Sequence, residues 1–314
     1  MFIRRRQAPS PHDEANENTN RRCRLSESRT LNPELVRLQE LGWAVPEADS
    51  EGVRWLEDQS ARISYPREVL DTLAADGGGE GFWLDARGNA VGTLLKDAGV
   101  STLWDVGAGT GVMTSRLSAY GVEVISIEPL PEGARAIAAM GAETFCGTLQ
   151  HLELPDGSLP AVGLFDVVEH LERPSELLAE VARVLQPGGI LLMTVPAYQW
   201  LWSAEDIELG HFRRYSTSTA REELKGTGLS VVAAAYLFAT LVPAAALLRT
   251  LPYRLGRRKD SAAALERNVE RLQPSSRVNN VANRIFSAEA RIARNVPLPF
   301  GLSVLVVARR VASQ

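Results

Sequence analysis

Short apolar runs alternate with amphipathic segments of helical period from about residue 101 onward. The runs predict strands at 101–106, 122–127, 143–146, 161–165 and 190–195, and the amphipathic segments predict helices at 110–120, 131–140 and 174–185. Two later apolar runs, 229–236 and 302–308, predict a sixth and a seventh strand. Strands that alternate with helices favour a parallel sheet covered on both faces, so we expect an α/β fold with a doubly wound, mostly parallel, seven-stranded sheet.

The segments outside this alternation differ in character. Residues 1–50 are rich in Arg, Asn, Glu, Ser and Pro without sustained periodicity, which predicts a disordered extension. Residues 51–100 are expected to form helices that cover one edge of the sheet, with a break at Gly77–Gly79. The core at 101–236 is then followed by a helical insertion at 237–300 and by a final strand and tail at 301–314.

The first strand of the core runs directly into alternating glycines, Gly107, Gly109 and Gly111. Glycines let the backbone turn sharply and let a ligand approach where a Cβ would collide with it. A helix that begins near Thr110 would direct free N–H groups to the same place, which suits an anion. Glu128 ends the second strand 21 residues after Gly107, the distance at which an acid accepts hydrogen bonds from a ribose diol. The combination predicts a site for adenosine with an anionic tail.

A dinucleotide-binding loop shares most of this pattern but has its third glycine where this chain has Val112. The difference, together with the lack of a recognisable hydride-transfer acid, disfavours an NAD-dependent oxidoreductase. A non-catalytic protein that binds nucleosides or a membrane surface is the second alternative.

The downstream segments resemble those of class I S-adenosylmethionine-dependent methyltransferases, in particular a bacterial small-molecule subgroup of the methyltransferase type 11 kind. The resemblance covers about residues 80 to 310 and rests on these segments: Phe82–Arg87, Asp105–Gly111, Glu128, Gly147–Pro155, Leu164–His170, Val184–Pro196 and Asp206–Tyr215. Two departures stand out: Thr148 replaces the usual acid after the glycine of the adenine loop, and Ser158–Ala161 replaces a common Ser-Phe-Asp entry to the fourth strand.

The resemblance implies S-adenosylmethionine as the cofactor and a small molecule as the methyl acceptor, with a lipid-linked or isoprenoid-like acceptor as the finer expectation. The implied cofactor-binding residues are Asp105, Gly107, Ala108, Gly109, Gly111, Glu128, Pro129, Thr148, Leu149, Phe165 and Asp166.

Catalysis in such enzymes rests mainly on orientation, because the methyl group on the cofactor sulfonium is already activated. A general base is needed only where the acceptor must lose a proton, and the candidates are His170 and His211. For each histidine the alternative is a structural role in capping a helix or ordering a loop. Arg213 and Arg214 could bind an acidic group of the acceptor or lie on the surface. The aromatic segment Tyr198–Trp202 predicts either a wall of the acceptor pocket or a packed cluster.

Composition agrees with a globular enzyme, because 45% of the 314 residues are hydrophobic, 23% are charged and the net charge is −4. Cys23 and Cys146 are too few and too far apart for a disulfide framework or a metal clip, so no metal is expected and a reducing compartment is favoured. The start of the chain, Met1–Arg6, lacks the apolar run of a signal peptide. We therefore expect a cytoplasmic protein without a nucleic-acid partner, and the oligomeric state stays open.

The insertion contains an ambiguous apolar stretch at 226–248, whose 23 positions carry no charge and could span a bilayer. Pro243, the many alanines and the need to pair the last two strands favour a buried strand followed by an apolar helix over about 237–248. From Arg249 onward, 13 Arg and Lys face only 4 Asp and Glu. Contact with an anionic membrane at the inner face is one interpretation of this segment, and a helical lid with a solvated basic face is the other. The basic residues that follow the helix are Arg249, Arg254, Arg257, Arg258 and Lys259.

Overall fold

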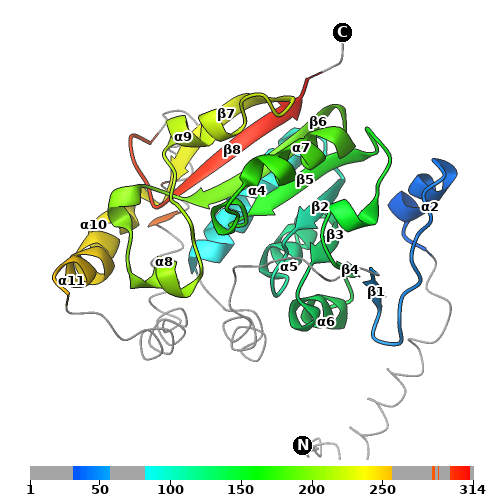
Figure 1. The fold of residues 1–314 in the computed structure, drawn as a ribbon, viewed down its shortest axis with the longest axis horizontal. Coiled ribbons are helices and arrows are strands. Elements are labelled where there is room, and N and C mark those ends of the chain that lie inside the picture. The colour runs from blue at the N-terminus through cyan, green and yellow to red at the C-terminus, as the bar shows by residue number, and fades with distance from the viewer. Residues whose placement is uncertain (1–30, 57–81, 257–284, 287–288, 290–297, 312–314) are drawn as a thin grey trace, which may run out of the picture. The chain divides into compact units, whose positions relative to one another are not determined.

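The computed structural model describes residues 31–56, 82–256, 285–286, 289 and 298–311 (Figure 1). The chain divides into two compact units at the boundary between Val45 and Pro46. In the first unit, the described residues contain helix α2 (Pro33–Glu40). The Asn32 side chain accepts a hydrogen bond from the Glu34 N–H at 2.8 Å, and Pro33 occupies the first turn, which together start a helix. The expectation of disorder over 1–50 was therefore wrong for residues 33–40, whereas residues 1–30 lie outside the described residues.

The described residues of the second unit form an eight-stranded sheet with the order β1-β4-β3-β2-β5-β6-β8-β7. The expected strands are all present, but the predicted count of seven was one too low. The extra strand, β1 (Val53–Trp55), pairs in parallel with β4 at the edge, in a segment for which we expected helices. Three residues are too few to show the alternation of a strand. The other strands are β2 (Thr102–Val106), β3 (Glu123–Glu128), β4 (Glu143–Cys146), β5 (Leu159–Phe165), β6 (Leu185–Pro196), β7 (Leu229–Leu237) and β8 (Ser303–Arg310).

All neighbouring strands are parallel except at β8, which runs antiparallel to both β6 and β7. From the central strand β2 the chain first proceeds to β3 and β4 and then crosses to β5 and β6 on the other side. Right-handed crossovers in opposite directions place the intervening helices on opposite faces, which confirms the doubly wound arrangement. The order reverses between β2 and β5, and sheets of this kind bind ligands beyond the carboxyl ends of the strands at such a reversal.

The helices pack along both faces of the sheet (Figure 1). Val91 and Leu95 of one helix join Met113 and Leu117 of the next in a buried cluster over the central strands. The helix after the glycine loop begins at Val112, so the predicted start at Thr110 was two residues early. The helices outside the insertion are α4 (Phe82–Asp97), α5 (Val112–Ser118), α6 (Pro131–Ala139), α7 (Pro174–Val184), α8 (Ala204–Glu208) and α9 (Thr217–Glu223).

The insertion between β7 and β8 begins with short helical pieces rather than one helix. Leu237 still belongs to β7, where it pairs with Ser303, so the predicted helix start at 237 was too early. β7 lies at the edge of the sheet and exposes 60% of Val232, so the expectation of a buried strand was also wrong. No helix in the described part of the insertion or elsewhere among the described residues is long and apolar enough to cross a membrane. The pieces are η4 (Ala239–Leu241), α10 (Val242–Ala245), the π-helical η5 (Ala246–Thr250) and α11 (Leu251–Arg254).

Candidate cofactor and acceptor site

The glycine loop leaves β2 with three residues in the left-handed region, Gly107, Gly109 and Gly111, at φ of 74°, 59° and 79°. Only the Gly109 position faces open space, because a Cβ built there meets no heavy atom within 4 Å. A Cβ on Gly107 would instead lie 2.8 Å from Val167 Cγ2, and one on Gly111 would collide with Met140. Gly109 therefore matches the expected close approach of a ligand, whereas the other two glycines are required by packing within the protein.

Gly133, in α6, supports this loop and was not among the predicted site residues. A Cβ on Gly133 would collide with the Gly109 carbonyl oxygen and lie 2.8 Å from Glu128 Cγ. Glycine in the first turns of a helix is unfavourable by itself, so the close approach explains why it stands there. The sequence signal was the segment Pro131-Glu-Gly133, which begins three residues after the acid of β3.

The Glu128 carboxylate holds the loop at the end of β3. Its Oε2 accepts the Gly109 N–H at 2.7 Å, and its Oε1 accepts the Leu130 N–H at 2.8 Å. Burial raises the pKa of Glu128 to about 7. Behind the loop, Asp105 is buried and accepts a hydrogen bond from Thr114 Oγ1 at 3.0 Å, and burial raises its pKa to about 7 as well. Glu128 lies at the loop, as predicted, whereas the Asp105 side chain is directed into the protein.

The remaining predicted cofactor residues lie at the carboxyl ends of neighbouring strands. Ala108 donates its N–H to the Ile127 carbonyl at 3.2 Å, and Pro129 directly follows Glu128. After β4, Gly147 donates to the Glu128 carbonyl at 3.1 Å, which places the half-buried Thr148 beside the loop. Leu149 is fully buried, so its side chain belongs to the core and only its backbone borders this region.

The end of β5 carries Phe165 and Asp166. The Phe165 side chain is buried in the core cluster, which leaves its backbone as the part that can border a ligand. Asp166 has a φ of 58°, pairs with the buried Arg87 of α4 and accepts a hydrogen bond from Thr194 Oγ1 at 3.2 Å. Arg87 and Thr194 were not predicted as site residues. The only sequence signal for Arg87 was its place in the segment Phe82–Arg87.

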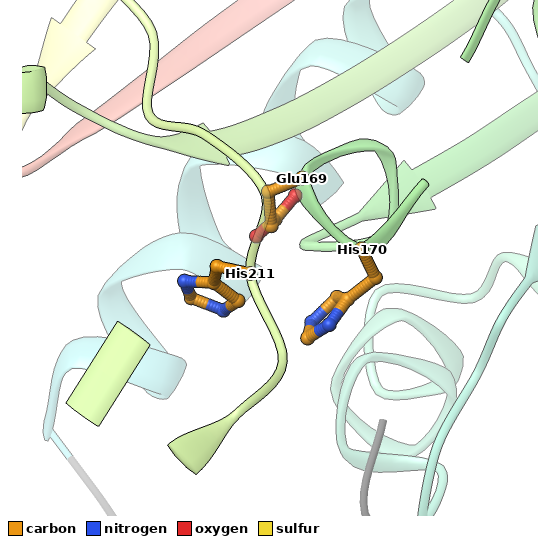
Figure 2. Close-up of side chains that lie close together, drawn as sticks. All are labelled: Glu169, His170 and His211. Carbon is orange, nitrogen blue, oxygen red and sulfur yellow. The ribbon is translucent and has the colours of Figure 1, made fainter. Parts of the chain in front are cut away.

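The predicted bases His170 and His211 meet next to this strand end (Figure 2). Their ring centroids are 4.6 Å apart and their planes are inclined by 77°. His170 belongs to η2 (Val168–His170), after β5, and His211 follows α8. The two segments are tied together because the Phe212 N–H donates to the Glu169 carbonyl at 2.8 Å. The structure thus brings together two residues that the sequence separates by 41 positions.

Asp206 orients His211. The carboxylate is fully buried, and its Oδ1 lies 2.9 Å from His211 Nδ1. Arg214 donates Nε to Oδ1 at 2.6 Å and Nη2 to Oδ2 at 2.9 Å, and the Ser203 N–H donates to Oδ2 at 2.8 Å. Burial alone would raise the pKa of Asp206, but the hydrogen bonds from His211 and Arg214 outweigh burial and lower this pKa to about 2. Asp206 is therefore ionised and fixes the position of the imidazole.

Glu169 and His170 lie in a poorly solvated environment. Glu169 is 1% exposed, and burial followed by the charge of Asp166 raises its pKa well above the usual range. Burial followed by the proximity of His211 lowers the pKa of His170 to about 4. His170 is consequently neutral near pH 7 and a weak base.

Arg213 and Arg214 both form hydrogen bonds within the protein. Arg213 donates to the carbonyls of Leu171 and Glu172 at 3.2 and 2.6 Å, and Arg214 is bound by Asp206. Their hydrogen bonds order the loops around the histidines. In the aromatic segment, Tyr198 stacks on Tyr236 with ring centroids 5.0 Å apart, whereas Trp200 is 46% exposed, so the segment is packed only in part.

Asp206→Asn is expected to lower the free energy of unfolding by about 3–5 kcal/mol, because it leaves the guanidinium of Arg214 half-buried without its counter-charge. Urea-induced unfolding at neutral pH measures the loss. The matched control is Asp156→Asn, which removes a mostly exposed partner of Arg183 and should cost only about 0.2–1 kcal/mol.

The contribution of Asp206 also has a defined pH dependence. Its folded-state pKa of about 2 lies below the ordinary value of 3.8, so its stabilisation is complete above about pH 4 and is lost as the pH falls toward 2. The difference between the wild type and Asp206→Asn should shrink over that window. An equal difference at pH 7 and pH 2 would contradict the role of the carboxylate.

The fold and the loop define a class: a doubly wound α/β domain with a glycine loop and a strand-terminal acid that can receive a nucleoside. A family model described as a methyltransferase domain matches residues 104–193. An uncharacterized methyltransferase of Mycobacterium ulcerans (strain Agy99) is 32% identical over 178 residues, which cover 55% of this chain and 67% of that protein. The chain therefore belongs to the class I S-adenosylmethionine-dependent methyltransferases.

A second relative and one solved structure are also similar to this chain. An uncharacterized methyltransferase of Mycobacterium tuberculosis (strain ATCC 25618 / H37Rv) is 34% identical over 166 residues, and the match covers 52% of this chain and only 56% of that protein. The chain thus spans little more than half the length of this relative. A solved S-adenosylmethionine-dependent methyltransferase from Archaeoglobus fulgidus has a TM-score of 0.43 and 18% identity, with 71% of this chain and 94% of that chain covered.

Proposed function

We propose that the protein transfers a methyl group from S-adenosylmethionine to a small-molecule acceptor. The observation that carries the proposal is the pairing of Gly109 with Glu128 at the carboxyl ends of β2 and β3. The Glu128 carboxylate closes the loop by accepting the Gly109 N–H, and Gly109 is the loop glycine at which a Cβ would meet no heavy atom within 4 Å. This arrangement fits an adenosine whose ribose hydroxyls donate to Glu128.

The neighbouring residues fit the rest of the cofactor. Thr148 borders the loop where the adenine is expected, and its hydroxyl can donate or accept a hydrogen bond in place of the usual acid. The backbone of Phe165 and Asp166 borders the same strand ends. When bound, S-adenosylmethionine supplies a methyl group that is already activated on a sulfonium. The chain itself has to orient the acceptor and exclude water.

His211 is the residue that we assign as the general base. Its Nδ1 is engaged by Asp206, so Nε2 is the nitrogen that can take a proton from an acceptor hydroxyl or amine. His170, with its lowered pKa, is better suited to line the acceptor side as a neutral imidazole.

Glu128→Ala is expected to weaken the binding of S-adenosylmethionine by about 10- to 100-fold, because charge-assisted hydrogen bonds of about 1.5–3 kcal/mol are lost. Isothermal calorimetry with S-adenosylmethionine, S-adenosylhomocysteine and NAD measures this and tests the function itself. Tight binding of NAD alone would refute the proposal. Unchanged affinity in a folded Glu128→Ala protein would remove this residue from the site.

Two controls sharpen the experiment. Glu123→Ala removes an acid at the opposite end of the same strand and should leave the affinity unchanged. The wild-type affinity should rise as the pH increases through about 7, because the ribose hydroxyls donate to the ionised form of Glu128 and burial has raised its pKa to that value.

A specific observation supports membrane-surface contact as a second role. Leu247 and Leu248 of η5, Leu251 of α11 and Leu255, which caps α11, are exposed and recur at helical spacing, and Leu247 exposes 63% of its surface. Such a face suits the interface of a bilayer and would bring a lipid-linked acceptor to the site. Two of the expected basic anchors are partly occupied, since Arg249 pairs with Glu205 at 2.9 Å and Arg254 donates to the Trp200 carbonyl at 2.9 Å. Arg257, Arg258 and Lys259 lie outside the described residues.

The protein is therefore expected to co-sediment with vesicles that contain anionic lipid and to dissociate as salt increases, because each basic residue contributes about 1 kcal/mol and is screened beyond roughly 10 Å at 0.1 M salt. Leu247→Ser combined with Leu251→Ser should reduce the bound fraction, and changing Arg257, Arg258 and Lys259 to Glu should abolish it. If the protein never sediments with these vesicles, the result favours the interpretation of the segment as a lid. Attachment that resists high salt and carbonate would point to insertion instead.

A further inference from the structure

Three side chains that commonly ligate metals converge at the end of β5 (Figure 2). Glu169 and His170 come from η2, and His211 comes from the segment after α8. One ligand atom from each of them lies within 4.8 Å of the other two. No metal site was expected from the sequence, and spacing does not reveal this set because the two segments are far apart in the chain.

The His211 ring has a second partner that fixes it. Its Nδ1 is engaged by Asp206, whose position is in turn fixed by Arg214 and Ser203. The His170 ring packs against the His211 ring, with ring centroids 4.6 Å apart. Metal-binding histidines typically show this arrangement, because a partner on one ring nitrogen orients the other nitrogen toward the ion.

The other acids next to this cluster are already paired with arginines. Asp166 is paired with Arg87, and Asp206 is paired with Arg214. Among the described residues, no cation lies within ion-pair distance of Glu169, and its buried Oε2 has no hydrogen-bond partner. A buried carboxylate oxygen without a partner is costly, and a bound ion would supply the missing interaction.

We infer that Glu169, His170 and His211 bind a divalent transition-metal ion. Two imidazoles and one carboxylate suit Zn²⁺, Fe²⁺, Mn²⁺ or Co²⁺, whereas Mg²⁺ and Ca²⁺ prefer oxygen ligands. Ligand atoms that share an ion at about 2.0–2.2 Å lie roughly 3–4 Å apart, so binding would draw these side chains slightly together.

This inference deepens the proposed function and rests on it for its catalytic meaning. Three protein ligands leave a coordination position for an acceptor oxygen, whose pKa the ion would lower. In that state the loss of the acceptor proton would depend on the ion, and His211 would act as a ligand rather than as the base.

The test uses the full chain after treatment with a chelator. Titration with Co²⁺ should produce the visible absorption bands of a bound ion at one equivalent per chain, and calorimetry should show tight binding of Zn²⁺ but not of Mg²⁺. Glu169→Gln, His170→Gln and His211→Gln should each weaken Co²⁺ binding by at least about 10- to 100-fold. His151→Gln, in η1 (Gln150–Leu152), changes a histidine outside the cluster and should not weaken it.

The affinity for S-adenosylmethionine is measured for the same variants, and unchanged values show that the cofactor loop is folded. Should Glu169→Gln fail to fold because the residue is buried, the less buried His170 provides the decisive variant. The metal site is refuted if the protein does not bind Co²⁺ or if none of the three changes weakens Co²⁺ binding. If the same protein still binds S-adenosylmethionine, the proposed function stands. Metal binding by a protein that has no affinity for S-adenosylmethionine would support the metal site and refute the proposed function.

Discussion

Gly109→Val should bind S-adenosylmethionine at least about 100-fold more weakly than the wild type, which corresponds to a loss of roughly 3 kcal/mol or more. Two effects act together. The new side chain would fill the open space beside the loop, and a β-branched residue is strained at a φ of 59°. Calorimetry with the folded variant gives the affinity directly.

The chain offers a close control for the backbone strain. Gly99, which follows α4, has a φ of 69°, and a Cβ built there also meets nothing within 4 Å. Gly99→Val should therefore cost similar stability without a change in affinity. If both variants bind the cofactor normally, the loop does not contact it. Gly107→Val is a less specific probe, because its side chain would collide with Val167 inside the protein.

His211→Gln should lower the turnover number by about 10²–10⁴-fold once an acceptor is known, while the affinity for S-adenosylmethionine stays within about twofold. The reason is that a base acts on the acceptor proton and has no part in binding the cofactor. The measurement compares kcat for the methyl transfer with the cofactor affinity from calorimetry.

Loss of a metal ligand would also slow the reaction, so the assay is performed both after chelation and with added Co²⁺. If the lower kcat of His211→Gln persists in the chelated protein, His211 acts as the base. If kcat is lower only when the ion is present, His211 acts as a metal ligand. His151→Gln again serves as the control. Full turnover of His211→Gln under both conditions would mean that orientation alone drives the transfer.

Local patterns predicted the strands of this fold well. The apolar runs that became β2, β3, β5 and β6 are buried along nearly their whole length, so hydrophobic pattern and structure coincide. The pattern failed where tertiary context decides. β1 is a strand only because β4 is available as a partner, and β7 is apolar although the edge of the sheet leaves part of it exposed.

The candidate site likewise has one part that local sequence predicts and another part that depends on tertiary contacts. The glycine loop and Glu128 follow from residues within one βαβ unit and could be placed from sequence. Arg87 reaches Asp166 across 79 positions, and Gly133 meets Gly109 from another element, so these contacts exist only after the sheet has formed. His170 and His211 were named from the chemistry of imidazole. Their proximity to each other and to Glu169 could not be read from spacing.

The two hydrogen bonds that Glu128 accepts from Gly109 and Leu130 join the loop to the strand end before any ligand arrives. In the proposed site, the backbone that would face the ribose is thus held in one conformation by the protein itself. Little chain entropy remains to be lost when the nucleoside enters, so more of the contact energy is available for affinity. A flexible loop with the same glycines would bind the same molecule more weakly, and this carboxylate makes the loop a rigid receptor.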